Sequence, residues 1–539
     1  MLGANDVANA FATSVGSGAL SLKSAILIAA IMEFLGAFLL GGNVASKIMK
    51  GITVADHYVE CPEVLMFGMM CVLVGVAAWL ILATLYGLPV STTHSCIGGI
   101  VGMAVVSMGM SAVNWKQVGL VALSWIISPI SSGLLSTLIF VLVRKFILRA
   151  SNSLERSFKS YPAIIAFTFA LNLFLVLYSS KSLNLNMPLM LVFVICLAIG
   201  IIIALILQFT FIPYARKTIE REKNAASAEI SAKEVKVSIE MVETKTEIPI
   251  VVEVRKQSQE VAITTAESTT ETTTTEITSE KKVEEDKKKT DEEIPSESNA
   301  VVTIPVEKTP STPVAKVPVQ NIHAELEDEK SKVYQMHKNA EVFDEDTERL
   351  FTYLQILTAI FNSFAHGAND VANAIGPFAM CIQLYRTGDV MAETRVEPWI
   401  LVLGGIGIIV GLACLGYKVM AAIGVNMVKV TPSRGFSIEI GSALIVIIGS
   451  AMGLPLSTTH CKVGSTVGIG MAEGKNGVNW SLLYGVFAGW IVTLFVCAVS
   501  TGLIFAFAAY APKLLHVCSY SHLWLPHFSK VFPRYDCKL

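Results

Sequence analysis

Charge is scarce in most of this chain, and that scarcity excludes a water-soluble globular protein. Only 16% of the 539 residues are charged, whereas 53% are hydrophobic. Residues 214–349 alone contain 20 of the 41 lysines and arginines and 30 of the 43 acids, so the remainder is poorer still. The apolar runs of the remainder suit a hydrocarbon layer of about 30 Å. The sequence therefore predicts an all-α membrane protein, a polytopic helical bundle, and not a soluble enzyme.

Closely spaced cysteines and the sequence pattern of a signal peptide are also lacking. The ten cysteines are scattered and include no C-x-x-C pair, which argues against a disulfide framework or a zinc site. Several cysteines lie inside apolar runs, where a buried thiol is the expected state. No basic segment followed by a short apolar core and a cleavage site opens the chain, so no removable signal peptide is expected. Insertion into a membrane must then use the spans themselves.

Composition divides the chain into two membrane parts and a polar connection. We expect an N-terminal membrane repeat at 1–212, a disordered linker at 213–349, a C-terminal membrane repeat at 350–511 and a short tail at 512–539. The linker is rich in Ser, Thr, Glu and Lys, and such a composition cannot bury a core. Basic residues cluster in 144–159 and again where the linker opens. The positive-inside rule places both on the cytoplasmic side.

Two words of sequence occur twice. GANDVANA stands at 3–10 and 367–374, and GLPVSTTH at 87–94 returns as GLPLSTTH at 453–460. Collinear matches at one offset of about 365 residues indicate that the two membrane halves are homologous. Prolines interrupt the second word in both halves, so broken helices or helical hairpins are expected there. Because repeats around a midplane site are typical of secondary transporters, we expect two inverted-topology repeats.

The first repeated word puts acids and amides inside an apolar run, where unpaired polar groups are costly. Carboxylate and amide oxygens suit a hard cation such as Na⁺. Spacings of three and four residues keep these side chains on one helix face. The sodium-binding candidates are Asn5, Asp6, Asn9, Asn369, Asp370 and Asn373, with Asp6 and Asp370 as the metal-ligating carboxylates. The alternative is hydrogen bonding between helices that pack through small residues.

The second repeated word places hydroxyls at the start of the half-helix that follows each proline. A helix N-terminus carries a partial charge of about +0.5 and unpaired N–H donors, so it attracts anions without Arg or Lys. The candidate anion ligands are Ser91, Thr92, Thr93, Ser457, Thr458 and Thr459. N-capping by Ser and Thr is the alternative, and it is compatible with anion binding. His94 and His460 are expected behind the ligands, as indirect donors or as packed imidazoles.

Two further acids, Glu33 and Glu439, lie in apolar segments. A carboxylate without a partner is costly at such depth, and intramembrane acids usually serve transport. We expect Glu33 to take part in proton or cation coupling, with an interfacial or protonated structural role as the alternative. Glu439 lies nearer the end of its segment and is a second candidate.

Together these words resemble those of the PiT family, the type III sodium-dependent inorganic phosphate cotransporters of eukaryotes. The resemblance rests on both repeated words, on TPSRGFSIEIGSA at 431–443 and on the long charged loop, and it covers about 400 residues. It implies sodium-driven symport of inorganic phosphate across the plasma membrane, with Na⁺ as a co-transported ion and no cofactor. It also implies that the hydroxyls line the phosphate site. The acids that the family needs for transport match Asp6, Glu33, Asp370 and Glu439. The histidine that precedes the family's second motif matches His366, which is expected behind the ligands.

An apolar span usually leads into the first GANDVANA, as 350–366 leads into the second. Here only Met1 and Leu2 precede it, so the first repeat is expected to lack its first span. Sodium-coupled phosphate symport by alternating access is the main hypothesis. The alternatives are a non-transporting phosphate-binding receptor or sensor, a truncated remnant of a carrier, and a proton-coupled symporter of an oxyanion. The expected partners are phosphate, sodium and the lipid bilayer, with a homodimer as an option and no nucleic acid.

Overall fold

The computed structural model describes residues 1–179, 188–243, 323–392 and 396–510. One compact unit comprises Met1–Ile219 and Gln320–Leu539, and Glu220–Val319 form a second. The described residues fold into helices, and the one β-bridge among them joins Thr53 to Val113. The expected tail at 512–539 lies outside the described residues.

Eight helices in the described part of the chain are long and apolar enough to cross a membrane. They are α2 (Leu22–Gly51), α3 (Pro62–Leu85), α5 (Trp115–Val143), α6 (Ser153–Ser179), α7 (Leu189–Glu243), α11 (Pro398–Leu415), α13 (Pro432–Ala451) and α15 (Trp480–Tyr510). Their outward faces carry large apolar side chains, such as Phe495, Leu503 and Phe507 of α15, all of them exposed. Only helices satisfy their own backbone groups in lipid, which explains this choice of structure. The prediction of an all-α, multi-span membrane protein is confirmed.

Helical hairpins are present at both copies of the second repeated word. The first hairpin runs from α3 through a break to α4 (Thr92–Met108), and the second runs from α13 to α14 (Thr458–Ala472). Gly87 and Gly453 begin the breaks with φ of 68° and 67°, a left-handed conformation that glycine adopts without a steric penalty. The proline two residues later cannot continue a helix, so the chain turns before α4 and α14 begin.

The two copies of the first repeated word lie in different surroundings. The first copy lies inside α1 (Leu2–Gly16). The second copy spans the end of α9 (Glu345–Asp370) and the start of α10 (Ala372–Thr387), with Val371 between the two helices.

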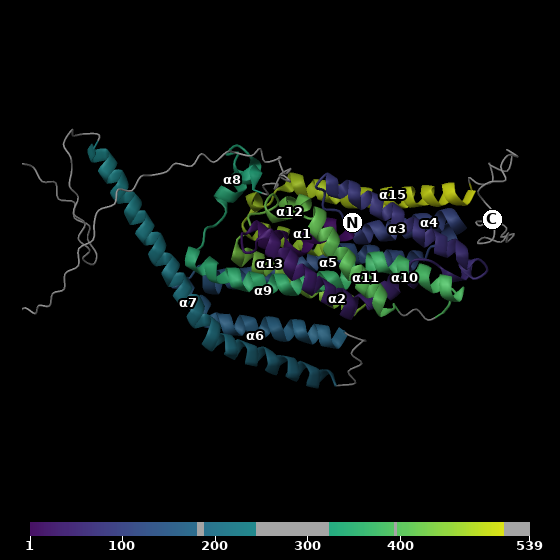
Figure 1. The fold of residues 1–539 in the computed structure, drawn as a ribbon, viewed down its shortest axis with the longest axis horizontal. Coiled ribbons are helices and arrows are strands. Elements are labelled where there is room, and N and C mark those ends of the chain that lie inside the picture. The colour runs from purple at the N-terminus through teal and green to yellow at the C-terminus, as the bar shows by residue number, and fades with distance from the viewer. Residues whose placement is uncertain (180–187, 244–322, 393–395, 511–539) are drawn as a thin grey trace, which may run out of the picture. The chain divides into compact units, whose positions relative to one another are not determined.

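The two halves of the chain interlock. Helix α4 packs along α15, α14 packs along α5, and α1 packs against α11 and α12 (Tyr417–Gly424). Figure 1 shows α15 running beside α3 and α4. Helix α2 lies backbone to backbone with α9: a Cβ on Gly36 would lie 2.1 Å from Phe364 O, and one on Gly367 would lie 2.2 Å from Glu33 O. Glycines at these two positions therefore set the distance between α2 and α9.

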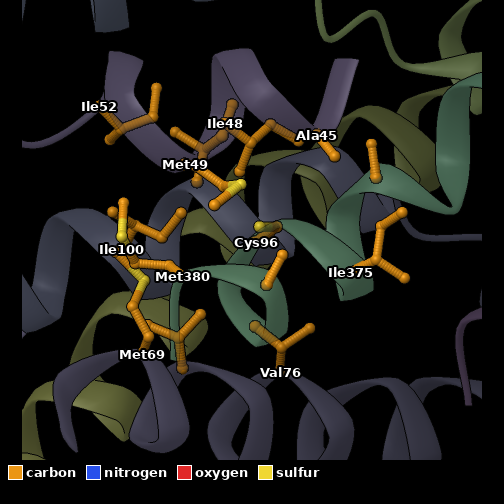
Figure 2. Close-up of a cluster of buried hydrophobic side chains, with 14 of the residues drawn as sticks. Ala45, Ile48, Met49, Ile52, Met69, Val76, Cys96, Ile100, Ile375 and Met380 are labelled. Carbon is orange, nitrogen blue, oxygen red and sulfur yellow. The ribbon is translucent and has the colours of Figure 1, made fainter. Parts of the chain in front are cut away.

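A buried apolar cluster holds the first hairpin in place. Ile48 of α2, Met69 of α3, Ile100 of α4 and Met380 of α10 are at most 1% exposed and pack in one cluster (Figure 2). Inside a bilayer such contacts stabilise through close packing more than through exclusion of water. The cluster fixes the first hairpin, which belongs to the first half, against α10 of the second half.

Helices extend into both ends of the range 213–349. At one end α7 continues past Pro213 to Glu243. At the other end α8 (Lys332–Asn339) buries Val333 and Met336. The expectation of a disordered linker otherwise falls on residues 244–322, which lie outside the described residues. The remaining short elements are helical turns at Ala55–Tyr58, Met110–Ala112, Arg144–Leu148, Ala324–Leu326 and Lys475–Gly477.

Candidate functional site

The tips of the two hairpins meet inside the bundle. Ser91 Oγ and Ser457 Oγ lie 2.8 Å apart and share a hydrogen bond. Each serine is also an N-cap, because its Oγ accepts from the backbone N–H of the histidine three residues later, at 3.3 Å in both hairpins. Thr93 Oγ1 donates to Leu456 O at 3.0 Å, which adds a second contact between the tips. The N-termini of α4 and α14 therefore converge on one point.

The second asparagine of each GANDVANA copy binds the hairpin of the opposite half. Asn9 Nδ2 donates to Thr458 Oγ1 at 3.2 Å and to Thr459 Oγ1 at 2.9 Å. In the same way, Asn373 Nδ2 donates to Thr92 Oγ1 at 3.2 Å and to Thr93 Oγ1 at 3.3 Å. Each half thus contributes its asparagine to the hairpin of the other half, an arrangement that we call the exchange at the site. Neither half could form the site alone.

The first asparagine of each GANDVANA copy forms hydrogen bonds within its own half instead. Asn5 Nδ2 donates to Leu88 O at 2.9 Å, and Asn5 Oδ1 accepts from Val90 N at 3.1 Å. This pair of bonds satisfies backbone groups in the break between α3 and α4, which would otherwise be unpaired. Asn369 Nδ2 donates to Ser450 Oγ at 3.0 Å near the end of α13. These two amides position the hairpins, whereas the amides of Asn9 and Asn373 face the tips.

Carboxylates from both halves converge beside the tips. Single ligand atoms of Asp6, His366 and Asp370 lie within 4.8 Å of one another, a grouping that could hold a metal ion. Asp370 Oδ2 accepts from Thr458 Oγ1, so a carboxylate and a hairpin hydroxyl are in direct contact. His366 lies between two acids, with Nδ1 3.0 Å from Glu33 Oε2 and Nε2 2.9 Å from Asp370 Oδ2. The three carboxylates and the imidazole are at most 2% exposed.

Glu439 belongs to a separate polar cluster, one helical turn from the tips. Its carboxylate accepts from Thr13 Oγ1 at 2.7 Å and from Thr358 Oγ1 at 2.8 Å, and Ser14 and Gln355 also donate to it. The Nζ of Lys462 donates to Thr13 Oγ1 at 3.2 Å. Thr13 lies four residues after Asn9 on α1, and Lys462 lies four residues after Thr458 on α14. Each therefore lies on the same helix face as a residue of the site, one turn further along.

All the candidate residues of the sequence are buried, with none more than 5% exposed. The structure gathers the six hydroxyls, both aspartates, Asn9, Asn373 and His366, and it joins Glu33 to them through His366. It places Glu439 apart, and it places His94 and His460 behind the tips. Sequence reasoning missed Thr13, Ser14, Gln355, Thr358 and Lys462. Only Lys462 carried a signal, since a lysine in an apolar helix indicates function.

This arrangement offers two kinds of ligand side by side. The hydroxyls and the N-termini of α4 and α14 are donors for an anion. The carboxylate and amide oxygens next to them are ligands for hard cations. Groups of opposite preference lie in one buried place, within hydrogen-bond distance of each other, so an anion and cations bound there would stabilise one another.

Comparison with known proteins agrees with this geometry. Residues 2–501 match the phosphate transporter family. Sodium-dependent phosphate transporter 1 of Rattus norvegicus is 30% identical over 628 residues, which cover 93% of this chain and 92% of the relative. The phosphate-repressible phosphate permease pho-4 of Neurospora crassa is 30% identical over 562 residues, which cover 95% of each chain.

A solved structure described as the sodium-dependent phosphate transporter is similar in fold as well. It has a TM-score of 0.66 and 28% sequence identity, and the match covers 95% of this chain and 96% of that one. The family is one of transporters and not of enzymes. Because the family match spans nearly all of the described helices, the chain belongs to the phosphate transporter family.

Proposed function

We propose that this chain carries inorganic phosphate together with sodium ions across a membrane by alternating access. The observation that carries the proposal is the exchange at the site, where Asn9 binds Thr458 and Thr459 and Asn373 binds Thr92 and Thr93. The exchange places anion donors and cation ligands of both halves together. It also supports two inverted-topology repeats as the origin of the site.

Phosphate binds between the hairpin tips in this proposal. Ser91, Thr92, Thr93 and the matching Ser457, Thr458 and Thr459 supply hydroxyl donors, and α4 and α14 direct their N-termini at the anion. The hydrogen bond between Ser91 and Ser457 is exchanged for bonds to phosphate oxygens. Because a phosphate oxygen accepts a hydrogen bond more strongly than a neutral hydroxyl does, replacement of the bond between the serines favours the bound anion.

Sodium binds the oxygens beside the tips. Asp6 with Asn9 and Asp370 with Asn373 form the two proposed cation clusters, and the bonds of both asparagines to hairpin hydroxyls connect the clusters to the phosphate. Without cations, two buried carboxylates would repel an approaching anion. Sodium therefore binds first and raises the affinity for phosphate, and this order is the physical basis of coupling.

Access to the site requires a conformational change. Ser91 and Ser457 are at most 1% exposed, and the aspartates are fully buried. A ligand reaches such a site only when packed helices move apart on one side and then on the other. We propose that the two hairpins move together, because their tips are hydrogen-bonded to each other and to Asn9 and Asn373 of the opposite halves.

We place the protein in the plasma membrane, with the exposed apolar faces in lipid and the linker at 213–349 in the cytoplasm. Arg144, Lys145 and Arg149 at the end of α5 and Arg216 and Lys217 on α7 support this orientation, because basic residues concentrate on the cytoplasmic side. A homodimer is one option for its assembly.

The direct test is uptake of labelled phosphate by cells or proteoliposomes that contain the chain. We expect uptake in sodium and almost none when choline replaces sodium, with competition by arsenate and not by sulfate. Undiminished uptake in choline that follows a pH gradient would indicate a proton-coupled carrier. Phosphate binding without uptake would indicate a receptor or sensor. The Asp370→Asn variant, made at equal surface expression, is the matched negative control.

A further inference from the structure

Four aromatic rings form one stack behind the hairpin tips. Trp125 of α5 stacks on His94 of α4, with ring centroids 3.7 Å apart and an interplanar angle of 27°. The ring of His94 lies 4.6 Å from that of His460 of α14. His460 stacks on Trp490 of α15 at 3.6 Å and 25°. The stack therefore crosses from one half of the chain to the other and ends in a tryptophan on each side.

The stack is connected directly to the serines at the tips. His94 N and His460 N donate to the Oγ of Ser91 and Ser457, and these two hydroxyls bond to each other. His460 Nδ1 also lies 2.9 Å from Trp125 O, a contact between the halves. Any change in the spacing of the two imidazoles therefore moves the two N-caps relative to each other.

Ring contact, rather than hydrogen bonding, explains the two tryptophans. Trp125 Nε1 and Trp490 Nε1 are buried and have no hydrogen-bond partner among the described residues. An indole at each place leaves an N–H unsatisfied, which costs free energy. The same residue nevertheless stands at matching positions in both halves, 365 residues apart. The large flat ring, stacked on an imidazole, is what the two positions have in common.

We propose that Trp125 and Trp490 are positioning residues that set the distance between the two hairpin tips through His94 and His460, and thereby decide which oxyanion the site accepts. The proposal rests on the proposed function, because it concerns the phosphate site between those tips. The stack lies behind the hydroxyls that bind the anion in the proposed function, so it can change their spacing without contacting the ligand. Tetrahedral anions of different size then fit the tips to different extents.

The test replaces the indole in graded steps. Trp490→Phe, Trp490→His and Trp490→Leu reduce the stacked area progressively, and the same three changes at Trp125 form a parallel series. Loss of a ring contact predicts a KM for phosphate that rises about two- to tenfold from tryptophan to leucine, with Vmax per surface molecule retained. The ratio of the arsenate inhibition constant to the phosphate KM should shift along the same series. Phe140→Leu is the matched control.

Phe140 is a fully buried aromatic on the same helix as Trp125, and it packs against Phe343 and below Arg434. Its loss should lower stability without changing KM or the arsenate ratio. If the tryptophan series leaves both values at those of the parent protein, the proposal is wrong. If the leucine variants do not reach the membrane, the phenylalanine and histidine variants decide by the same order. Absence of sodium-dependent uptake in the parent would instead refute the proposed function.

Discussion

Removal of the Lys462 ammonium should destabilise the protein, and part of that loss should disappear when the Glu439 charge is removed as well. Hydrogen bonds of 2.7 and 3.2 Å that share the Thr13 hydroxyl place the two charged groups within about 6 Å of each other. Both side chains are at most 1% exposed. At an effective dielectric constant of about 20, two charges at that separation attract by about 3 kcal/mol. Loss of one partner of a buried pair costs about 3 to 5 kcal/mol.

A double-mutant cycle measures this interaction. We expect Lys462→Met and Glu439→Gln each to lower the free energy of unfolding in mixed micelles by about 3 to 5 kcal/mol. The double variant should lose less than the two single losses together, with a coupling energy of about 2 to 3 kcal/mol. Hydrogen bonds from Thr13 and Thr358 remain in the Lys462→Met protein and limit its loss. Additive losses, with coupling below about 0.5 kcal/mol, would refute this reasoning.

Three other outcomes follow from the geometry. Gly367→Ala puts a Cβ 2.2 Å from Glu33 O, so it should separate α2 from α9 and cost about 1 to 3 kcal/mol; unchanged thermal stability in detergent would argue against that close approach. Asp6→Asn removes a charged sodium ligand and should raise the sodium concentration for half-maximal uptake about tenfold or more, as a sodium titration of uptake would detect, whereas an unchanged value would exclude Asp6 as a ligand. Burial lowers the pKa of His337, so the neutral imidazole is favoured while α8 is packed against the bundle. The packing of α8 should be complete at neutral pH and weaken as the pH falls below about 6.5, where the histidine of the released helix takes up a proton first. Equal protection of Lys332–Asn339 from hydrogen exchange at pH 7.5 and pH 5.5 would contradict this.

The local structure of the site was predictable because it is encoded in short words. GLPVSTTH and GLPLSTTH each contain a glycine that permits a left-handed turn, a proline that cannot donate a backbone hydrogen bond, and a serine that caps the next helix. Both copies form the same hairpin, with φ near 68° at the glycine and a capping bond of 3.3 Å. The burial of the repeated acids and amides also followed from their apolar neighbours.

The exchange between halves was not predictable. Spacing along a helix restricts only residues on that helix, and Asn9 is separated from Thr458 by 449 residues. Nothing in the sequence states that the amide of one repeat binds the hairpin of the other and not its own. The same limit hid the partner of Lys462, since the lysine is visible in the sequence but its connection to Glu439 through Thr13 is a property of the packing.

Folding of the segment that precedes α9 was missed for a different reason. Its composition is charged, which favoured a solvated linker, yet Val333 and Met336 are spaced by three residues and form one buried face of α8. Docking is completed by Glu341, which accepts two hydrogen bonds from Arg149 at 2.7 and 2.9 Å. An amphipathic helix of eight residues is too short to stand out against a long polar range.

The most direct test of the shared site is the thermodynamic coupling of the two ligands in the purified protein. Phosphate would be titrated calorimetrically at several sodium concentrations, and sodium would be titrated at several phosphate concentrations. If anion and cations bind side by side, each ligand must strengthen the other by the same factor, about tenfold or more. Asp370→Asn should reduce that factor. Phosphate affinity that stays constant across all sodium concentrations would contradict a shared site.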